Sequence, residues 1–170
     1  MKREKHISHA WKIYTDGAIR PERGISGLAA LVRNDQNRIC YWWNRRTGKL
    51  TNNEAEYAAV IFALEMMLKV VRPASCHEIA IFTDSQILVH QMTGKAVTNS
   101  PGLQRAKNRL IPLVKKFQNV TFTHIPREQN KLADALAFEA IEGPPRASRP
   151  SLAAPRLDLW EQFDSIWRNT

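Results

Sequence analysis

The most constraining feature of this sequence is a change in hydrophobic period at Asn53. Before it, apolar and polar residues alternate as they do in β-strands, whereas after it apolar residues recur every three or four positions until Pro73. The apolar positions of this second segment are Tyr57, Val60, Ile61, Leu64, Met67, Leu68 and Val71. The spacing predicts one long helix, whose apolar face must be covered by a sheet or by other helices.

Three strands are predicted ahead of this helix. Residues 11–15 alternate in strand fashion and stop at the dipeptide DG at 16–17, which is typical of a turn. Residues 25–33 and 38–46 follow, and the polar sequence NDQN at 34–37 that separates them resembles a hairpin connection. We therefore expect the chain to begin with three antiparallel strands.

The second half of the chain alternates between strand and helix patterns. Residues 79–82 form a short apolar run that predicts a fourth strand, and the helical pattern QILVHQM at 86–92 follows it. Residues 101–117 predict a further helix, 120–125 a fifth strand and 130–141 a final helix. The order βββαβααβα predicts an α/β fold in which helices flank a five-stranded mixed sheet.

Four regions are expected from the composition along the chain. Residues 1–10 are a basic extension, 11–142 a single domain and 143–156 a proline-rich linker. In residues 157–170 the apolar side chains nearly trace one helical face: Leu157, Leu159, Trp160, Phe163, Ile166 and Trp167. This amphipathic segment is expected either to dock on its own domain or to bind a protein partner.

The overall composition is typical of a basic protein of the cell interior. Lys and Arg number 25 against 16 Asp and Glu, giving a formal charge of +9, which favours a polyanionic partner. Cys40 and Cys76 lie in apolar stretches without metal-ligand spacing, so we expect both to be reduced core residues. No run reaches the roughly 18 apolar residues of a membrane span, and the N-terminus lacks a signal-peptide pattern. We expect a cytoplasmic monomer that does not bind membranes.

Four acidic residues lie near the ends of predicted elements: Asp16, Glu56, Asp84 and Asp134. A mixed sheet could bring these ends together. Each residue also has a purely structural interpretation. Asp16 fits a turn, Glu56 fits a capping box with Asn53, Asp84 fits a helix cap and Asp134 fits the positive end of a helix.

Four motifs in order resemble the type 1 ribonuclease H (RNase HI) family. They are YTDGA at 14–18, TNNEAEYAAVIFALE at 51–65, FTDSQ at 82–86 and HIPREQNKLADALA at 124–137. The resemblance implies an RNase H-like fold and an enzyme that cuts the RNA strand of an RNA/DNA hybrid, leaving 5′-phosphate and 3′-hydroxyl ends. It also implies that the four acidic residues hold two Mg²⁺ ions, with Mn²⁺ as a possible substitute. Carboxylate oxygens are the hard ligands that Mg²⁺ requires.

The same resemblance implies further site residues. His124 takes the place of a family histidine that shuttles protons, although it also fits the inward end of a strand. Contacts to the hybrid are implied for Thr51, Asn52, Asn53, Gln86 and Arg127. Asn53 also fits a helix cap, and Arg127 also fits an ordinary exposed loop residue.

One segment departs from the family pattern. Between the helix at 86–92 and the next helix, the sequence lacks the Trp- and Lys-rich protrusion that many members carry. Basic residues that could replace its electrostatic role are Lys95, Arg105, Lys107, Arg109, Lys115 and Lys116. Two other functions remain open at this point: a catalytically silent module that binds hybrid or RNA, and a nuclease of the same fold for another nucleic acid.

Overall fold

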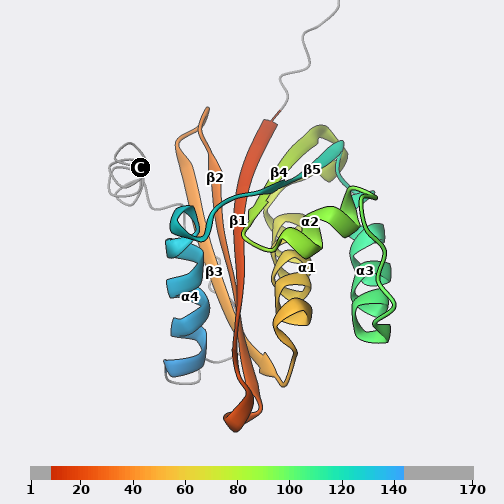
Figure 1. Ribbon diagram of the computed structural model, residues 1–170. Helices are drawn as coiled ribbons and strands as arrows, with labels where there is room; N and C mark the ends of the chain where they lie inside the picture. The colour runs from red at the N-terminus through yellow and green to blue at the C-terminus, as the bar shows by residue number, and fades with distance from the viewer. Residues whose placement is uncertain (1–8, 144–170) are drawn as a thin grey trace, which may run out of the picture.

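The computed structural model describes residues 9–143 and contains one five-stranded sheet, in the order β3-β2-β1-β4-β5 (Figure 1). β1 pairs antiparallel with β2, and β2 with β3, whereas β4 pairs parallel with both β1 and β5. The strands are β1 His9–Arg20, β2 Ile25–Asn34, β3 Ile39–Gly48, β4 His77–Thr83 and β5 Asn119–His124. This mixed sheet confirms the predicted fold.

Helices cover both faces of the sheet, unequally. They are α1 Asn52–Val70, α2 Gln86–Met92, α3 Pro101–Val114 and α4 Lys131–Glu142, and short 3₁₀ turns span Pro21–Arg23, Ala74–Cys76 and Arg127–Gln129. α1 to α3 pack on one face, and α4 lies alone among the described helices on the other (Figure 1). The element order βββαβααβα is the predicted one.

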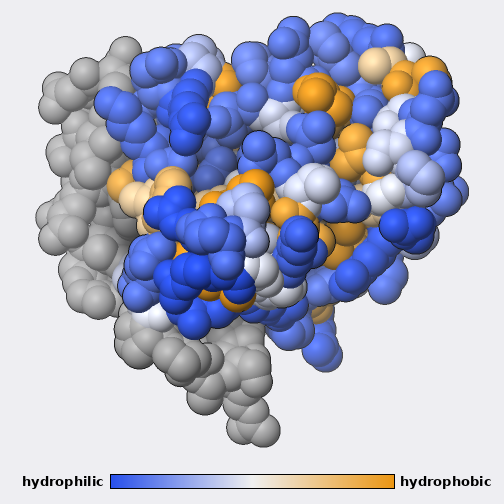
Figure 2. Space-filling model, turned by 60° about the horizontal axis from the view of Figure 1, so that its bottom comes forward, coloured by the Kyte–Doolittle hydropathy of each residue, from blue (hydrophilic) through white to orange (hydrophobic). Residues whose placement is uncertain are grey.

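α1 supplies the centre of the main core. Its buried side chains include Tyr57, Phe62 and Leu64, which pack with Ile13 of β1 and Ile81 of β4. Fully burying one such side chain stabilises the fold by about 1.5–3 kcal/mol. The surface turned forward in Figure 2 is mostly hydrophilic with small apolar patches, which is consistent with most large apolar side chains being inside.

The first turn of α1 corrects one expectation. The N-cap is Thr51, not Asn53, and its partner in the capping box is Glu54. The Thr51 backbone N–H donates to Glu54 Oε2 at 3.0 Å, and the Glu54 backbone N–H donates to Thr51 Oγ1 at 3.3 Å. Glu56 lies two residues further along the helix and takes no part in the cap, so its carboxyl group is available for other contacts.

β1 corrects a second expectation. Asp16 and Gly17 lie inside a strand that continues to Arg20, and the chain turns only at Pro21–Arg23, followed by Gly24 with φ +61°. Gly17 has a different role, since a Cβ at this position would overlap the backbone carbonyl group of Ala55. The missing side chain therefore allows α1 to approach β1 closely.

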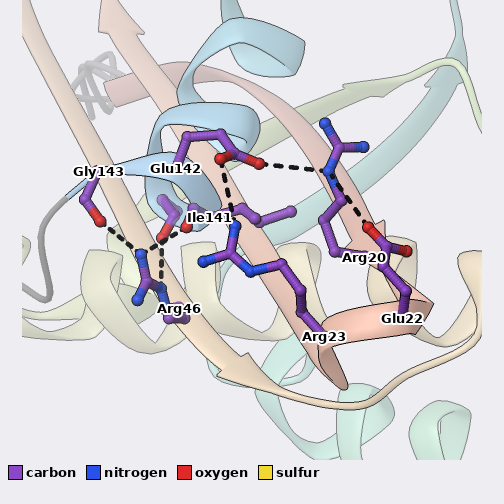
Figure 3. A network of polar contacts seen from close by, with 8 residues as sticks. Arg20, Glu22, Arg23, Arg46, Ile141, Glu142 and Gly143 are labelled. Carbon is purple, nitrogen blue, oxygen red and sulfur yellow. Dashed lines mark hydrogen bonds and ion pairs between the residues drawn. The ribbon is translucent and has the colours of Figure 1, made fainter.

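α4 is fixed to the opposite face near its C-terminus. Gly27 of β2 lies against the backbone of Ala137, with no room for a Cβ. Arg46 of β3 donates a hydrogen bond to the carbonyl oxygen of Ala140 at 2.9 Å. It also donates to the carbonyl oxygens of Ile141 and Gly143 at the end of α4 (Figure 3). These carbonyl groups have no partner within the helix, so the guanidinium acts as a C-terminal cap.

A pair of arginines from the other side of α4 completes this anchor. Arg20 Nε lies 3.3 Å from Glu142 Oε1, and Arg23 Nη1 lies 3.2 Å from Glu142 Oε2 (Figure 3). The side chains are half-exposed, so each pair contributes at most about 1 kcal/mol.

The two cysteines differ in environment. Cys40 is buried, as predicted, but Cys76 is exposed in the 3₁₀ turn before β4, so its assignment to the core is wrong. Its apolar sequence neighbours belong to elements on either side of the turn. Within residues 9–143, every helix is too short or too polar to cross a lipid bilayer.

Candidate active site

The candidate site lies where β1 and β4 separate. Their parallel pairing ends at Tyr14 and Phe82, whose rings stack with centroids 4.9 Å apart. Asp16 stands two residues after Tyr14, and Asp84 stands two residues after Phe82. The two carboxylates thus occupy equivalent positions just beyond the end of the parallel β1–β4 pairing, although β1 itself continues to Arg20. A site where neighbouring parallel strands separate is common in sheets of this kind.

Glu56 completes a group of three. Asp16, Glu56 and Asp84 each offer a carboxylate oxygen, and these oxygens all lie within 4.8 Å of one another. Glu56 reaches the group from α1 because Gly17 allows that helix to lie directly on β1. Three of the four acidic residues that the sequence analysis expected to meet therefore converge.

The environment opposes ionisation of these acids. The pKa of Asp16 is raised from 3.8 to about 7, first by burial and then by the charges of Asp84 and Asp134. The pKa of Glu56 is raised well above its usual value, again first by burial and then by Asp16 and Asp84. Such shifts mark groups that a bound cation would stabilise in their charged form.

Asp134 lies at the border of this group. It is in the first turn of α4, half-buried, and its Oδ1 accepts a hydrogen bond from Arg127 Nη2 at 3.2 Å. Its charge contributes to the raised pKa of Asp16. Its carboxylate is not, however, one of the three whose oxygens lie within 4.8 Å of one another. Arg127 therefore pairs with a site acid here, which had not been expected.

Asn130 is a site residue that sequence reasoning missed. Its side chain is 2% exposed, and its Nδ2 donates to the Thr15 carbonyl oxygen at 2.9 Å and to Asp84 Oδ1 at 3.1 Å. It thus ties the start of α4 to β1 and holds one site carboxylate in place. Its position before a helix suggested only the start of that helix, and its side chain makes no capping bond.

The remaining predicted residues lie on three elements, β5, α1 and α2. His124 is the last residue of β5, exposed and opposite Thr83 of β4. Thr51 and Asn52 are exposed and Asn53 is half-buried at the start of α1, and Gln86 is exposed at the start of α2. Their roles in substrate binding or proton transfer stay predictions.

The donor set fits divalent metal ions. Glu56 Oε2 is buried and has no hydrogen-bond partner among the described residues, an arrangement that normally costs about 1–3 kcal/mol. An all-carboxylate group suits hard cations such as Mg²⁺ and Mn²⁺ rather than zinc, which prefers nitrogen and sulfur ligands.

Comparison with known proteins identifies the family. A family model described as reverse transcriptase-like matches residues 14–140. The chain belongs to this RNase H-like family. The RNase H-like chain is 36% identical to Ribonuclease HI of Halobacterium salinarum over 129 residues, covering 76% of this chain and 63% of that protein. It is 30% identical to a bifunctional protein of Mycobacterium tuberculosis, of which it spans only 35%.

Solved structures agree with this assignment. The crystal structure of RNase H1 from Halobacterium salinarum aligns with a TM-score of 0.72 and 34% identity, covering 79% of this chain and 99% of that one. LC11-RNase H1, solved in complex with an RNA/DNA hybrid, gives 0.72 and 32%, covering 78% and 96%. The predicted RNase H-like fold is therefore confirmed.

Proposed function

We propose that this protein is a metal-dependent endonuclease that hydrolyses the RNA strand of RNA/DNA hybrids. The observation that carries the proposal is the convergence of Asp16, Glu56 and Asp84 within 4.8 Å. A protein that only binds nucleic acid gains nothing from clustered acids beside a polyanion, because they repel its phosphates. The hybrid is the proposed substrate because a structural relative was solved bound to one.

The acidic residues would hold two Mg²⁺ ions. Asp16, Glu56 and Asp84 would provide the inner ligands, and Asp134 would complete the site from α4. When bound, Mg²⁺ supplies Lewis acidity for in-line displacement at the scissile phosphate, leaving 5′-phosphate and 3′-hydroxyl ends. Asn130 keeps the Asp84 carboxylate oriented through its 3.1 Å hydrogen bond.

Residues around the acids would place the substrate. His124, exposed at the end of β5, would hold or release a proton near the reacting phosphate. Thr51, Asn52 and Asn53 at the start of α1 and Gln86 at the start of α2 would contact the backbone and minor groove, where 2′-hydroxyl groups distinguish RNA from DNA. Arg127 would exchange its contact with Asp134 for a phosphate.

A cleavage assay tests the proposal. The protein is incubated with labelled RNA/DNA hybrid, duplex RNA or duplex DNA, in Mg²⁺, Mn²⁺ or EDTA. We expect cutting of the RNA strand of the hybrid alone, no cutting in EDTA, and a loss of at least about 100-fold in Asp84→Asn, which removes a charged ligand.

The matched control is Asp35→Asn, the same chemical change in the exposed β2–β3 turn, which should leave cleavage nearly unchanged. Cutting that survives EDTA would contradict the metal-dependent mechanism. Tight hybrid binding without cutting in either metal would instead favour a silent binding module, and cutting of duplex RNA or DNA alone would change the substrate.

A further inference from the structure

A cavity of about 530 Å³ lies beside β5, the last strand of the sheet. It is bounded by β5 and by the C-terminal ends of α2 and α3, on the side of the molecule away from β3 and α4 (Figure 1). Thr121 and Lys115, which contribute to its lining, are exposed, so the cavity is open to solvent. Its apolar lining consists of five half-buried side chains: Met92, Ile111, Val114, Val120 and Phe122.

The outer edge of β5 is free. Among the described strands, β5 has a neighbour on one side only. The backbone N–H and C=O groups of a free strand edge can pair with an extended polypeptide. Many edge strands prevent such pairing with a lysine or a proline, whereas the sequence of β5, NVTFTH, contains neither. Val120 and Phe122 both line the cavity, so a strand added at this edge would place alternate side chains over it.

The surroundings of the cavity are basic. Residues 85–127, which include α2, α3 and β5, contain several Lys and Arg residues but no Asp or Glu. Arg109 of α3 is paired with Glu65 of α1. Lys115, which lines the cavity, and its neighbour Lys116 form no ion pair in the part of the chain that the structure describes. Lysines without a counter-charge beside an apolar cavity favour an acidic partner.

We propose that this cavity and the free edge of β5 form a docking site for an extended, acidic polypeptide segment of another protein. The segment would pair with β5 through main-chain hydrogen bonds and place an apolar side chain in the cavity. Its carboxylates would lie near Lys115 and Lys116. The cavity is at the opposite end of α2 from Asp84, a helix length of roughly 10 Å. A docked segment and a substrate at the site acids therefore occupy different ends of this helix.

The lining and the charge favour this occupant over three others. Nucleic acid binds through phosphates and stacked bases, but Phe122 is the only aromatic lining residue and is half-buried. A second copy of the chain would bring two lysine-bearing surfaces together, and like charges would oppose association. In residues 157–170 the apolar side chains recur with helical spacing, whereas a strand edge is matched by alternating side chains.

A peptide-binding assay tests the proposal. The probe is a short fluorescein-labelled peptide in which glutamate alternates with phenylalanine and valine, and fluorescence anisotropy measures its binding to the full-length protein in EDTA. We expect saturable binding that weakens about fivefold or more in Ile111→Ala and in Lys115→Glu. The matched controls, Ile87→Ala on α2 and Lys49→Glu after β3, change exposed residues outside the cavity and should bind like the wild type. Thermal denaturation checks that each variant is folded.

Several outcomes would overturn the proposal. One is unchanged binding in both cavity variants, and another is equal binding of a control peptide in which serine replaces the apolar residues. If Ile111→Ala weakened the binding of a short single-stranded DNA as much as that of the peptide, the cavity would belong to nucleic acid. Peptide binding seen only in Trp160→Ala/Trp167→Ala would assign it to residues 157–170, and a dimer that the peptide dissociates would assign it to a second copy. Because the peptide assay contains neither hybrid nor metal, its result does not depend on the proposed function.

Discussion

Asp16 lies in surroundings that favour its protonated form. Its pKa of about 7 in the folded protein exceeds the ordinary 3.8 because of burial and the charges of Asp84 and Asp134. The folded protein therefore keeps a proton that the unfolded chain releases above about pH 3.8. Asp16 therefore contributes its full stabilisation of the fold below about pH 3.8, the pKa in the unfolded chain. This contribution is lost as the pH rises to about 7, the pKa in the folded protein.

Asp16→Asn should remove this dependence, because the amide does not ionise. In EDTA, the free energy of unfolding of the variant relative to the wild type should increase from pH 4 to pH 7, by at most about 4 kcal/mol, and then remain level. Urea denaturation at a series of pH values measures this difference. A difference that does not vary with pH would contradict the raised pKa.

The site acids could be predicted from the sequence, whereas their support could not. Asp16, Glu56 and Asp84 lie in motifs with recognisable order, and two of them directly follow predicted strands. Asn130 bonds to the Thr15 carbonyl group, 115 positions away, and to Asp84, 46 positions away. No local pattern encodes these partners, because they meet only after β1, β4 and α4 have packed together.

At the scale of elements, the period of a segment predicted its type better than its ends. α1 was clear because its apolar spacing persists over five turns. β1 was predicted too short, since the dipeptide at Asp16 and Gly17 is also common in turns. What requires glycine there is the backbone of Ala55, a tertiary contact that strand periodicity cannot reveal.

Gly17→Ala tests this contact between β1 and α1. The added methyl group would overlap the Ala55 carbonyl group and displace the helix that carries Glu56. We expect the free energy of unfolding to fall by about 1–3 kcal/mol and cleavage to fall by about tenfold or more. Thermal denaturation and the hybrid cleavage assay measure the two effects.

Gly48→Ala is the matched control for this substitution. Gly48 ends β3, and a Cβ there meets open space. Its stability should stay within about 0.5 kcal/mol of the wild type. Equal losses in both variants would show that general strand effects, and not the contact with Ala55, explain the result.

The whole molecule combines a formal charge of +9 with a group of three acids, of which Asp16 is buried and Glu56 and Asp84 are half-buried. The positive charge attracts nucleic acid over long distances, whereas the acids repel its backbone at close range. Divalent cations would reconcile the two by neutralising the acids locally. The net charge could be predicted from the composition alone. The place where the acidic residues meet could be known only from the folded structure.

Divalent cations should therefore raise the melting temperature. At a Mg²⁺ concentration of about 100 times Kd, binding to the folded state adds about 2.7 kcal/mol, which corresponds to roughly 5–10 °C for a chain of this size. Differential scanning calorimetry in Mg²⁺ and in EDTA measures the shift, with NaCl at equal ionic strength as the control. The same shift in Asp84→Asn would indicate binding elsewhere.

Gly17 and Gly27 stand on neighbouring strands and receive helices from opposite sides, α1 on one and α4 on the other. The helices that carry Glu56 and Asp134 therefore rest directly on the backbone of the sheet. Loosening the reactive groups would mean lifting a helix off the sheet. Heat should accordingly abolish catalysis and cooperative structure in a single transition, without a folded but inactive state between them.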